Sequence, residues 1–138
     1  MNQTVHNLSQ AYKGILAADE STPSIQKKLL AVGLQSTEEL RKAYRTMLLT
    51  TPDIEKYVSG VILYEETLKQ GLGEILKAKG IEVGIKVDMG LESFNDTDEQ
   101  ITKGIEGLTE RLEEYRKLGA TFTKWRMVVK ITDNFPSE

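Results

Sequence analysis

The chain contains four runs of mainly apolar residues, and none of them alternates between apolar and polar positions. They cover residues 14–19, 60–64, 82–88 and 122–129. A strand with one exposed face would show such an alternation, whereas a strand of a covered parallel sheet is apolar throughout. We therefore predict four strands of one parallel sheet that is buried on both faces.

Helical patterns separate these runs. A helix is predicted over residues 24–32, because Gly33 suits the position just after a helix. A capping-box pattern predicts the start of a second helix, over residues 36–49. A shorter helix is predicted over residues 73–79. The clearest pattern predicts a helix over residues 98–118. Its apolar stripe consists of Ile101, Ile105, Leu108, Leu112 and Tyr115.

The order of these elements predicts the class of fold. Strands alternate with helices, which is typical either of a doubly wound sheet or of an arc of a (β/α)8 barrel. We predict a single α/β domain over residues 1–138 with about four βα units. Because residues 132–138 read as a loop, the far edge of the last strand is expected to be uncovered.

Composition excludes several classes of function. A net charge of −3 gives no general basic character for binding nucleic acid, and the absence of cysteine excludes disulfides and thiol chemistry. The one histidine, His6, is expected on the surface, and no metal site is implied. No apolar run approaches the about 20 residues of a membrane span, and no secretory signal is visible. We expect a cytoplasmic protein without membrane contact.

Charged residues follow the predicted strands at their carboxyl ends, where the active sites of parallel α/β proteins gather. They include Asp19, Lys86 and Asp88, and Lys124 and Arg126 on one face of the last strand. Two cations in an apolar strand are costly unless an anion meets them. Structural ion pairs, such as Asp88 with Lys124, are one interpretation. An excess of cations over acids favours the other, an anionic ligand such as phosphate or carboxylate.

The loop after the first strand has two interpretations on local sequence alone. Ser21 and Ser24 lie just before or at the start of a predicted helix, and Lys27 and Lys28 follow one turn later. Hydroxyls, cations and a helix N-terminus suit a phosphate group. The same serines could simply cap the helix. No P-loop or dinucleotide-binding glycine motif is present.

Four segments together resemble one known family. Residues 13–22, 59–67, 84–88 and 124–126 look like class I fructose-bisphosphate aldolase, in that family's order and close to its spacing. The resemblance covers nearly the whole chain. It implies the first half of a TIM (β/α)8 barrel, without the closing strands.

The resemblance also implies an activity and its residues. The family is a lyase of glycolysis and gluconeogenesis that cleaves fructose 1,6-bisphosphate into two triose phosphates through a lysine Schiff base. Asp19 matches the aspartate that assists proton transfer, and Lys124 matches the lysine that stabilises charge beside the Schiff base. No cofactor is implied. The residues that match positions near the substrate phosphates are Ser21, Ser24, Lys27, Lys28, Lys86 and Arg126.

Departures from the family pattern leave alternatives open. The family usually has glycine where Pro23 stands and arginine where Lys28 stands. Its chain is about twice as long, and the Schiff-base lysine belongs to strands five to eight, so we expect these 138 residues to be inactive alone. Lys86 or Lys124 forming the Schiff base is one alternative, and another sugar-phosphate barrel enzyme is a second. A third is a non-catalytic half-barrel that binds sugar phosphates or assembles with a partner chain, including its own copy.

Overall fold

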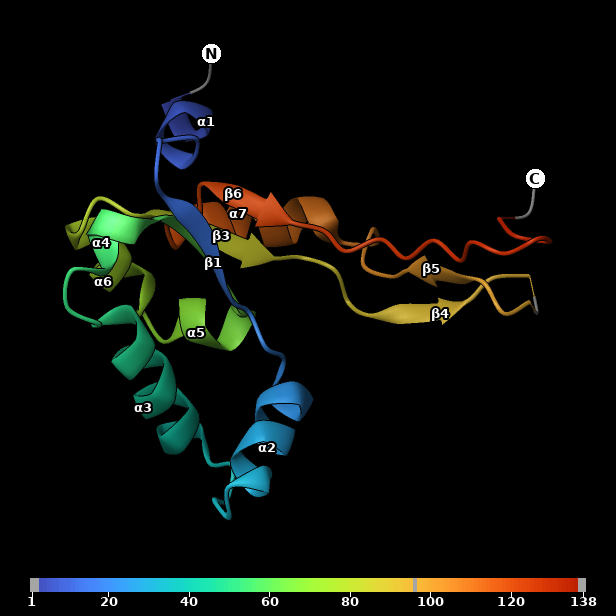
Figure 1. The fold of residues 1–138 in the computed structure, drawn as a ribbon, viewed down its shortest axis with the longest axis horizontal. Helices are drawn as coiled ribbons and strands as arrows, with labels where there is room; N and C mark the ends of the chain where they lie inside the picture. Colours follow the sequence, from blue (N-terminus) through green and yellow to red (C-terminus); the bar gives the residue numbers. More distant parts are fainter. Residues whose placement is uncertain (1–2, 96, 137–138) are drawn as a thin grey trace.

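The computed structural model describes residues 3–95 and 97–136 and contains one main sheet (Figure 1). Its four strands are all parallel and follow the order β1-β2-β3-β6, which confirms the predicted α/β fold. A separate antiparallel hairpin precedes the last strand of this sheet. The strands are β1 (Gly14–Ala18), β2 (Val58–Leu63), β3 (Glu82–Lys86), β4 (Leu91–Ser93), β5 (Gln100–Thr102) and β6 (Phe122–Lys124).

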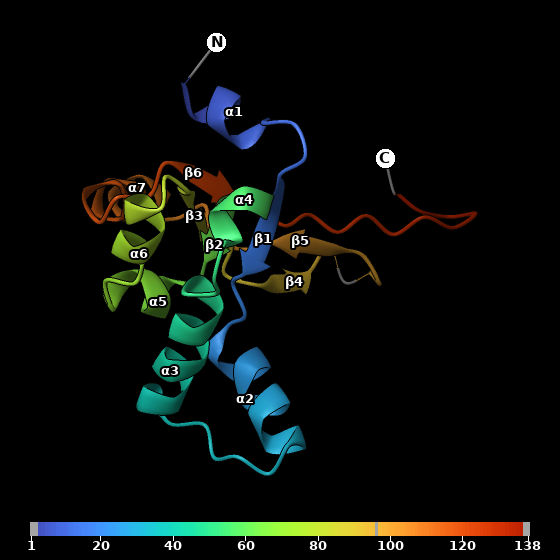
Figure 2. The same ribbon diagram turned by 60° about the vertical axis from the view of Figure 1, so that its left-hand side comes forward.

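Helices connect the parallel strands, and Figure 2 shows α5, α6 and α7 along one side of the sheet. The helices are α1 (Gln3–Leu8), α2 (Thr22–Ala31), α3 (Glu38–Leu49), α4 (Ile54–Tyr57), α5 (Glu65–Lys69), α6 (Gly73–Ala78) and α7 (Leu108–Lys117). The predicted helices at 24–32, 36–49 and 73–79 correspond to α2, α3 and α6. Within the described residues, no helix has the length and apolar character that a transmembrane span requires.

Helices cover one face of the sheet, and the other face is partly exposed. Val61, Leu63, Val83 and Ile85 point to the helices and are almost completely buried, so this face forms the core. On the opposite face, Ile15 of β1 is 49% exposed. The prediction that all four strands are buried on both faces is therefore wrong for β1, and it is also wrong for β6, of which no residue is buried. The open face is the one that would look into a barrel.

A layer of side chains crosses this open face. Ala17, Ile62, Gly84 and Phe122 are register partners on the four adjacent strands, so they point the same way. The ring of Phe122 occupies the space that a side chain on Gly84 would need. Stacked layers of this kind fill the interior of (β/α)8 barrels.

The predicted helix over residues 98–118 is wrong in its first half. Residues 100–102 form β5, and α7 begins only after Gly107. Gly104 has a φ of +117° and Gly107 a φ of +63°, which a continuous right-handed helix does not accommodate. Ile101 and Ile105 are consequently exposed in the hairpin region instead of joining an apolar helix stripe.

The predicted last strand over residues 122–129 is also too long. Pairing with β3 ends at Lys124, and the chain then runs beside the hairpin as an extended segment (Figure 1). The Thr102 hydroxyl holds this segment by donating to the Arg126 carbonyl at 2.7 Å. Met127 is 76% exposed and Val129 60% exposed. Pairing stops here because the partner strand β3 itself ends at Lys86, the register partner of Lys124.

Candidate functional site

A cleft of about 580 Å³ opens at the carboxyl ends of β1, β3 and β6. Six of the eight predicted site residues line this cleft, because parallel strands deliver their following residues to the same edge of the sheet. These six are Asp19, Ser21, Ser24, Lys86, Lys124 and Arg126.

Asp19 and Lys124 meet across the cleft. The Lys124 ammonium donates to the Asp19 carboxylate at 2.7 Å, and the side chains are 33% and 12% exposed, respectively. They come from the two outermost strands, which are separated by three strand spacings of about 4.8 Å each. The side chains reach one another because both project from the same face of a curved sheet. The pair keeps a carboxylate and an ammonium side by side where a ligand could contact both.

Lys86 forms a second pair in the cleft wall. Its ammonium donates to the Asp88 carboxylate at 2.8 Å and to the Asp88 carbonyl at 2.6 Å. Burial raises the pKa of Asp88, but the hydrogen bond and positive charge of Lys86, with Lys124 nearby, outweigh burial and lower it below its ordinary value. Asp88 therefore stays ionised and keeps the Lys86 ammonium at the end of β3.

The serines at the start of α2 face the cleft. Ser21 and Ser24 lie with their hydroxyl oxygens 3.0 Å apart. The Ser21 side chain makes no capping hydrogen bond to the helix, although its carbonyl accepts from the Ile25 amide at 3.0 Å. The capping interpretation is thus not supported for the Ser21 hydroxyl. Both hydroxyls can rotate to donate to an anion at the N-terminus of this ten-residue helix.

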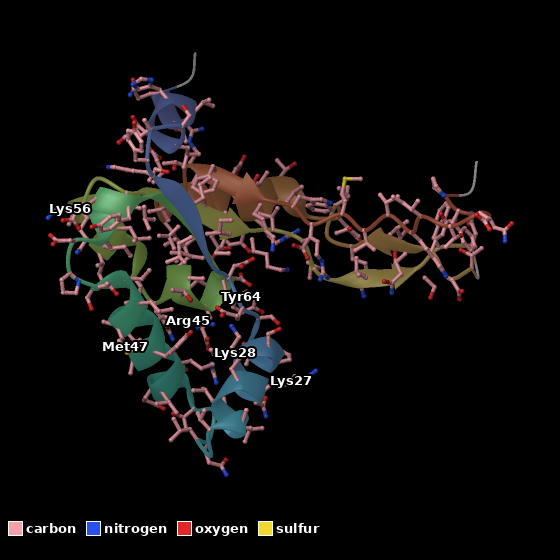
Figure 3. The ribbon with its side chains drawn as sticks, viewed as in Figure 1. Lys27, Lys28, Arg45, Met47, Lys56 and Tyr64 are labelled. Carbon is pink, nitrogen blue, oxygen red and sulfur yellow. The ribbon has the colours of Figure 1, made fainter. Side chains whose placement is uncertain are left out.

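Lys27 and Lys28 do not line the cleft. Lys28 forms an ion pair with Glu20, whose hydrogen bond and charge raise the pKa of Lys28. Lys27 is exposed on α2, and Figure 3 shows its side chain pointing away from the molecule. The sequence placed both lysines near the loop correctly, but the helix directs neither of them into the cleft.

The cleft lining holds as many acids as bases, but two of the acids, Glu20 and Glu65, form ion pairs with lysines that do not line it, Lys28 and Lys69. Among the described residues, its four acids are balanced by four bases. The acids are Asp19, Glu20, Glu65 and Asp88, and the bases are Lys86, Arg111, Lys124 and Arg126. Asp88 and Lys124, the example given for structural ion pairs, both form ion pairs but with other partners, Lys86 and Asp19. In the described part of the chain, Arg126 makes no ion pair, which leaves its guanidinium free for an anion.

Two contributors to the cleft could not be found from the sequence. Arg111 donates to the Val87 carbonyl at 3.0 Å and to the Gly104 carbonyl, so it joins α7 to the end of β3 and to the hairpin exit. Its acidic neighbours in the sequence suggest an ordinary solvated helix face. Tyr115, predicted as part of an apolar stripe, is buried beside it. Within residues 3–95 and 97–136, no group of three or more carboxylate or histidine side chains could hold a metal ion.

Comparisons with known proteins agree with this architecture. A family model described as fructose-bisphosphate aldolase class-I, in the glycolytic group, matches residues 1–138. A probable fructose-bisphosphate aldolase class 1 of Xanthomonas axonopodis is 47% identical over 132 residues, which cover 91% of this chain and 40% of that protein. Fructose-bisphosphate aldolase C-B of Danio rerio is 47% identical over 134 residues, which cover 91% of this chain and 37% of that protein.

A solved structure supports the same comparison. Fructose-bisphosphate aldolase of Plasmodium falciparum, crystallised with TRAP and a small-molecule inhibitor, superposes with a TM-score of 0.89 at 46% identity. The match covers 94% of this chain and 40% of that one. The chain therefore spans about two-fifths of the length of the relatives that it matches.

The fold and the cleft define an open part of a (β/α)8 barrel whose charged side chains gather at the carboxyl ends of its strands. With the family model matched over its whole length, the chain belongs to the class I fructose-bisphosphate aldolase family.

Proposed function

We propose that the chain supplies one side of an aldolase active site that cleaves fructose 1,6-bisphosphate into two triose phosphates through a lysine Schiff base. The observation that supports this proposal most directly is the Asp19–Lys124 pair, 2.7 Å apart in the cleft of a chain of this family. We further propose that the reaction serves glycolysis and gluconeogenesis in the cytoplasm.

Each cleft residue has a role that its chemistry allows. In a Schiff-base aldolase the iminium accepts the electron pair of the breaking C3–C4 bond, while the C4 hydroxyl loses its proton and becomes a carbonyl. The Asp19 carboxylate orients that hydroxyl and assists its proton transfer. The Lys124 ammonium stabilises the negative charge that develops beside it. Both groups act as charges, so neither needs to form a covalent bond.

Phosphate recognition falls to other residues that line the cleft. The Arg126 guanidinium can donate two parallel hydrogen bonds to a phosphate, and the Ser21 and Ser24 hydroxyls can add one each. Lys86 contributes positive charge while it remains paired with Asp88. Lys27 and Lys28 are not part of this proposed set, because neither lines the cleft.

Ligand titration tests the binding part of the proposal. We expect fructose 1,6-bisphosphate to shift the backbone NMR signals of Ser21, Ser24 and Arg126 in the isotope-labelled chain, and unphosphorylated fructose to shift none of them. Arg126→Met should weaken binding by about tenfold, since a hydrogen bond to a charged group is lost. Lys27→Met is the matched control, because it removes a cation outside the cleft. Equal weakening of binding by both variants would mean that the loss comes from the change in net charge and not from a contact in the cleft.

A retro-aldol assay tests catalysis. The chain is assayed alone and co-expressed with the segment of the Xanthomonas relative that it does not cover, and we expect turnover only from the combination. Lys124→Met in the combination should lower kcat by about 10²–10⁴-fold, the range for loss of a charge-stabilising or proton-transferring group. Borohydride trapping with the chain alone should give no reduced adduct. An adduct on Lys86 or Lys124 would assign the Schiff base to that lysine instead.

Assembly into a larger ring is a second candidate function. The outer edges of β1 and β6 have no strand neighbour in the described part of the chain, and Ile15 on the open face is half exposed. Two copies could cover these edges by forming eight strands around one axis. Light scattering tests this candidate: a concentration-dependent dimer that binds phosphate supports it, and a monomer at high concentration excludes it.

A further inference from the structure

Arg45 is a buried cation outside the cleft. It lies on α3 with 2% of its surface exposed. Among the described residues, it is the largest fully buried side chain. Its guanidinium forms an ion pair with Glu66 and lies 5.9 Å from the centre of the Tyr64 ring. Figure 3 shows Arg45 reaching from α3 toward Tyr64 and the start of α2.

One hydrogen bond links this buried arginine to the cleft. The second terminal nitrogen of Arg45 donates to the backbone carbonyl of Glu20 at 3.1 Å. Glu20 stands between Asp19, which pairs with Lys124, and Ser21, which faces the cleft. The Glu20 carbonyl belongs to the planar peptide unit that joins Glu20 to Ser21, so fixing this carbonyl restricts the orientation of the backbone at Ser21.

Stability alone does not account for such an arrangement. A buried ion pair contributes little net stability, and apolar side chains of similar volume often replace one without loss. What an apolar side chain cannot supply is a planar fork that binds a carboxylate on one side and a carbonyl on the other. The contacts of Arg45 therefore indicate a geometric role.

We propose that Arg45 is a positioning residue for the phosphate-binding loop, which we define as residues 19–24. It does not line the cleft, and it acts by holding the Glu20 carbonyl so that the loop hydroxyls face the cleft. This inference rests on the proposed function, because it assumes that the hydroxyls of the phosphate-binding loop bind a phosphate group.

Arg41 provides a matched control on the same helix. It also binds Glu66, with three hydrogen bonds of 2.5, 3.0 and 3.2 Å. Its remaining hydrogen bonds go to Ser36, and none goes to residues 19–24. Removing Arg41 thus disturbs the shared carboxylate but leaves the contact with the phosphate-binding loop in place.

The experiment compares Arg45→Ala with Arg41→Ala, using inorganic phosphate as the probe. Both variants should unfold at lower urea concentration than the parent chain. Only Arg45→Ala should lose phosphate affinity, by about tenfold, and shift the backbone NMR signals of residues 19–24. Guanidinium ion at low millimolar concentration should restore that affinity by occupying the vacated space, and it should not change the affinity of Arg41→Ala.

Further outcomes decide the proposal. If Arg45→Ala does not fold, Arg45→Lys keeps a charge beside Glu66 without the fork and should show the same loss of affinity. Unchanged phosphate affinity in either folded Arg45 variant overturns the positioning role. If the parent chain itself binds no phosphate, the proposed function fails, and the positioning role is then judged by the loop signals alone. Loop signals that stay at their parent positions would reject it.

Discussion

Glu66 couples α5 to two arginines of α3, and this arrangement makes stability depend on pH. Hydrogen bonds from Arg41 lower the pKa of Glu66 most; burial opposes the shift, and Arg45 adds to it, so that the pKa falls from 4.5 to about 2. A carboxyl whose pKa is depressed in the folded state stabilises the fold above its unfolded pKa.

We expect the chain to lose about 3 kcal/mol of unfolding free energy as the pH falls from 4.5 toward 2, since one pKa unit corresponds to about 1.4 kcal/mol. Urea unfolding at a series of pH values measures this loss. Glu66→Gln should flatten the acid limb of the profile. Glu113→Gln, at an exposed position of α7, should leave it unchanged.

Gly84 is a second position where one residue decides local packing. A methyl group there would overlap the Phe122 ring on the neighbouring strand. We expect Gly84→Ala to lower the unfolding free energy by about 1–3 kcal/mol, the usual effect of overpacking. Gly14→Ala, with no atom within 4 Å of the added carbon, should have a much smaller effect. Combining Gly84→Ala with Phe122→Leu should recover part of the loss if the overlap is the cause.

The cleft residues could be predicted to different degrees. Asp19, Lys86, Lys124 and Arg126 stand at or beyond strand ends, so strand spacing and the family resemblance were enough to bring them together. The partner of each cation could not be predicted, because ion-pair partners depend on side-chain directions that spacing does not give. Lys28 shows the same difficulty, since it pairs with Glu20 and does not itself line the cleft.

The β4–β5 hairpin shows why one element was predicted wrongly. The helical spacing of apolar residues that includes residues 98–107 is coincidental. The two glycines in this stretch decide its conformation. Glycines with positive φ allow the chain to turn from β5 into α7. By contrast, β2 and β3 were predicted nearly to their ends, because covered parallel strands are apolar throughout.

Gly104 should therefore tolerate substitution less well than Gly107. Gly104 has a φ of +117°, and an added methyl group would lie 3.1 Å from the Met89 amide nitrogen. Gly107 has a φ of +63° and open space around it. We expect Gly107→Ala to lower the unfolding free energy by about 1 kcal/mol and Gly104→Ala by more. Urea midpoints of the two variants give the comparison, and equal values would contradict the backbone explanation.

The sheet as a whole has a protected centre and two weaker edges. β2 and β3 each have a strand on both sides, whereas β1 and β6 each have one neighbour in the described part of the chain. We expect amide hydrogens of β2 and β3 to exchange slowest and those of β1 and β6 to exchange much faster. Hydrogen exchange followed by NMR measures this order. Uniformly slow exchange across all four strands would mean that something covers the edges.

Asp19 and Lys124 stand 105 residues apart in sequence, and this separation sets the order of events during translation. At about 5–20 residues per second, the ribosome makes the carboxylate about 5–20 seconds before the ammonium that neutralises it. On a nascent chain, the Asp19 carboxylate therefore lacks its Lys124 partner until β6 emerges from the ribosome.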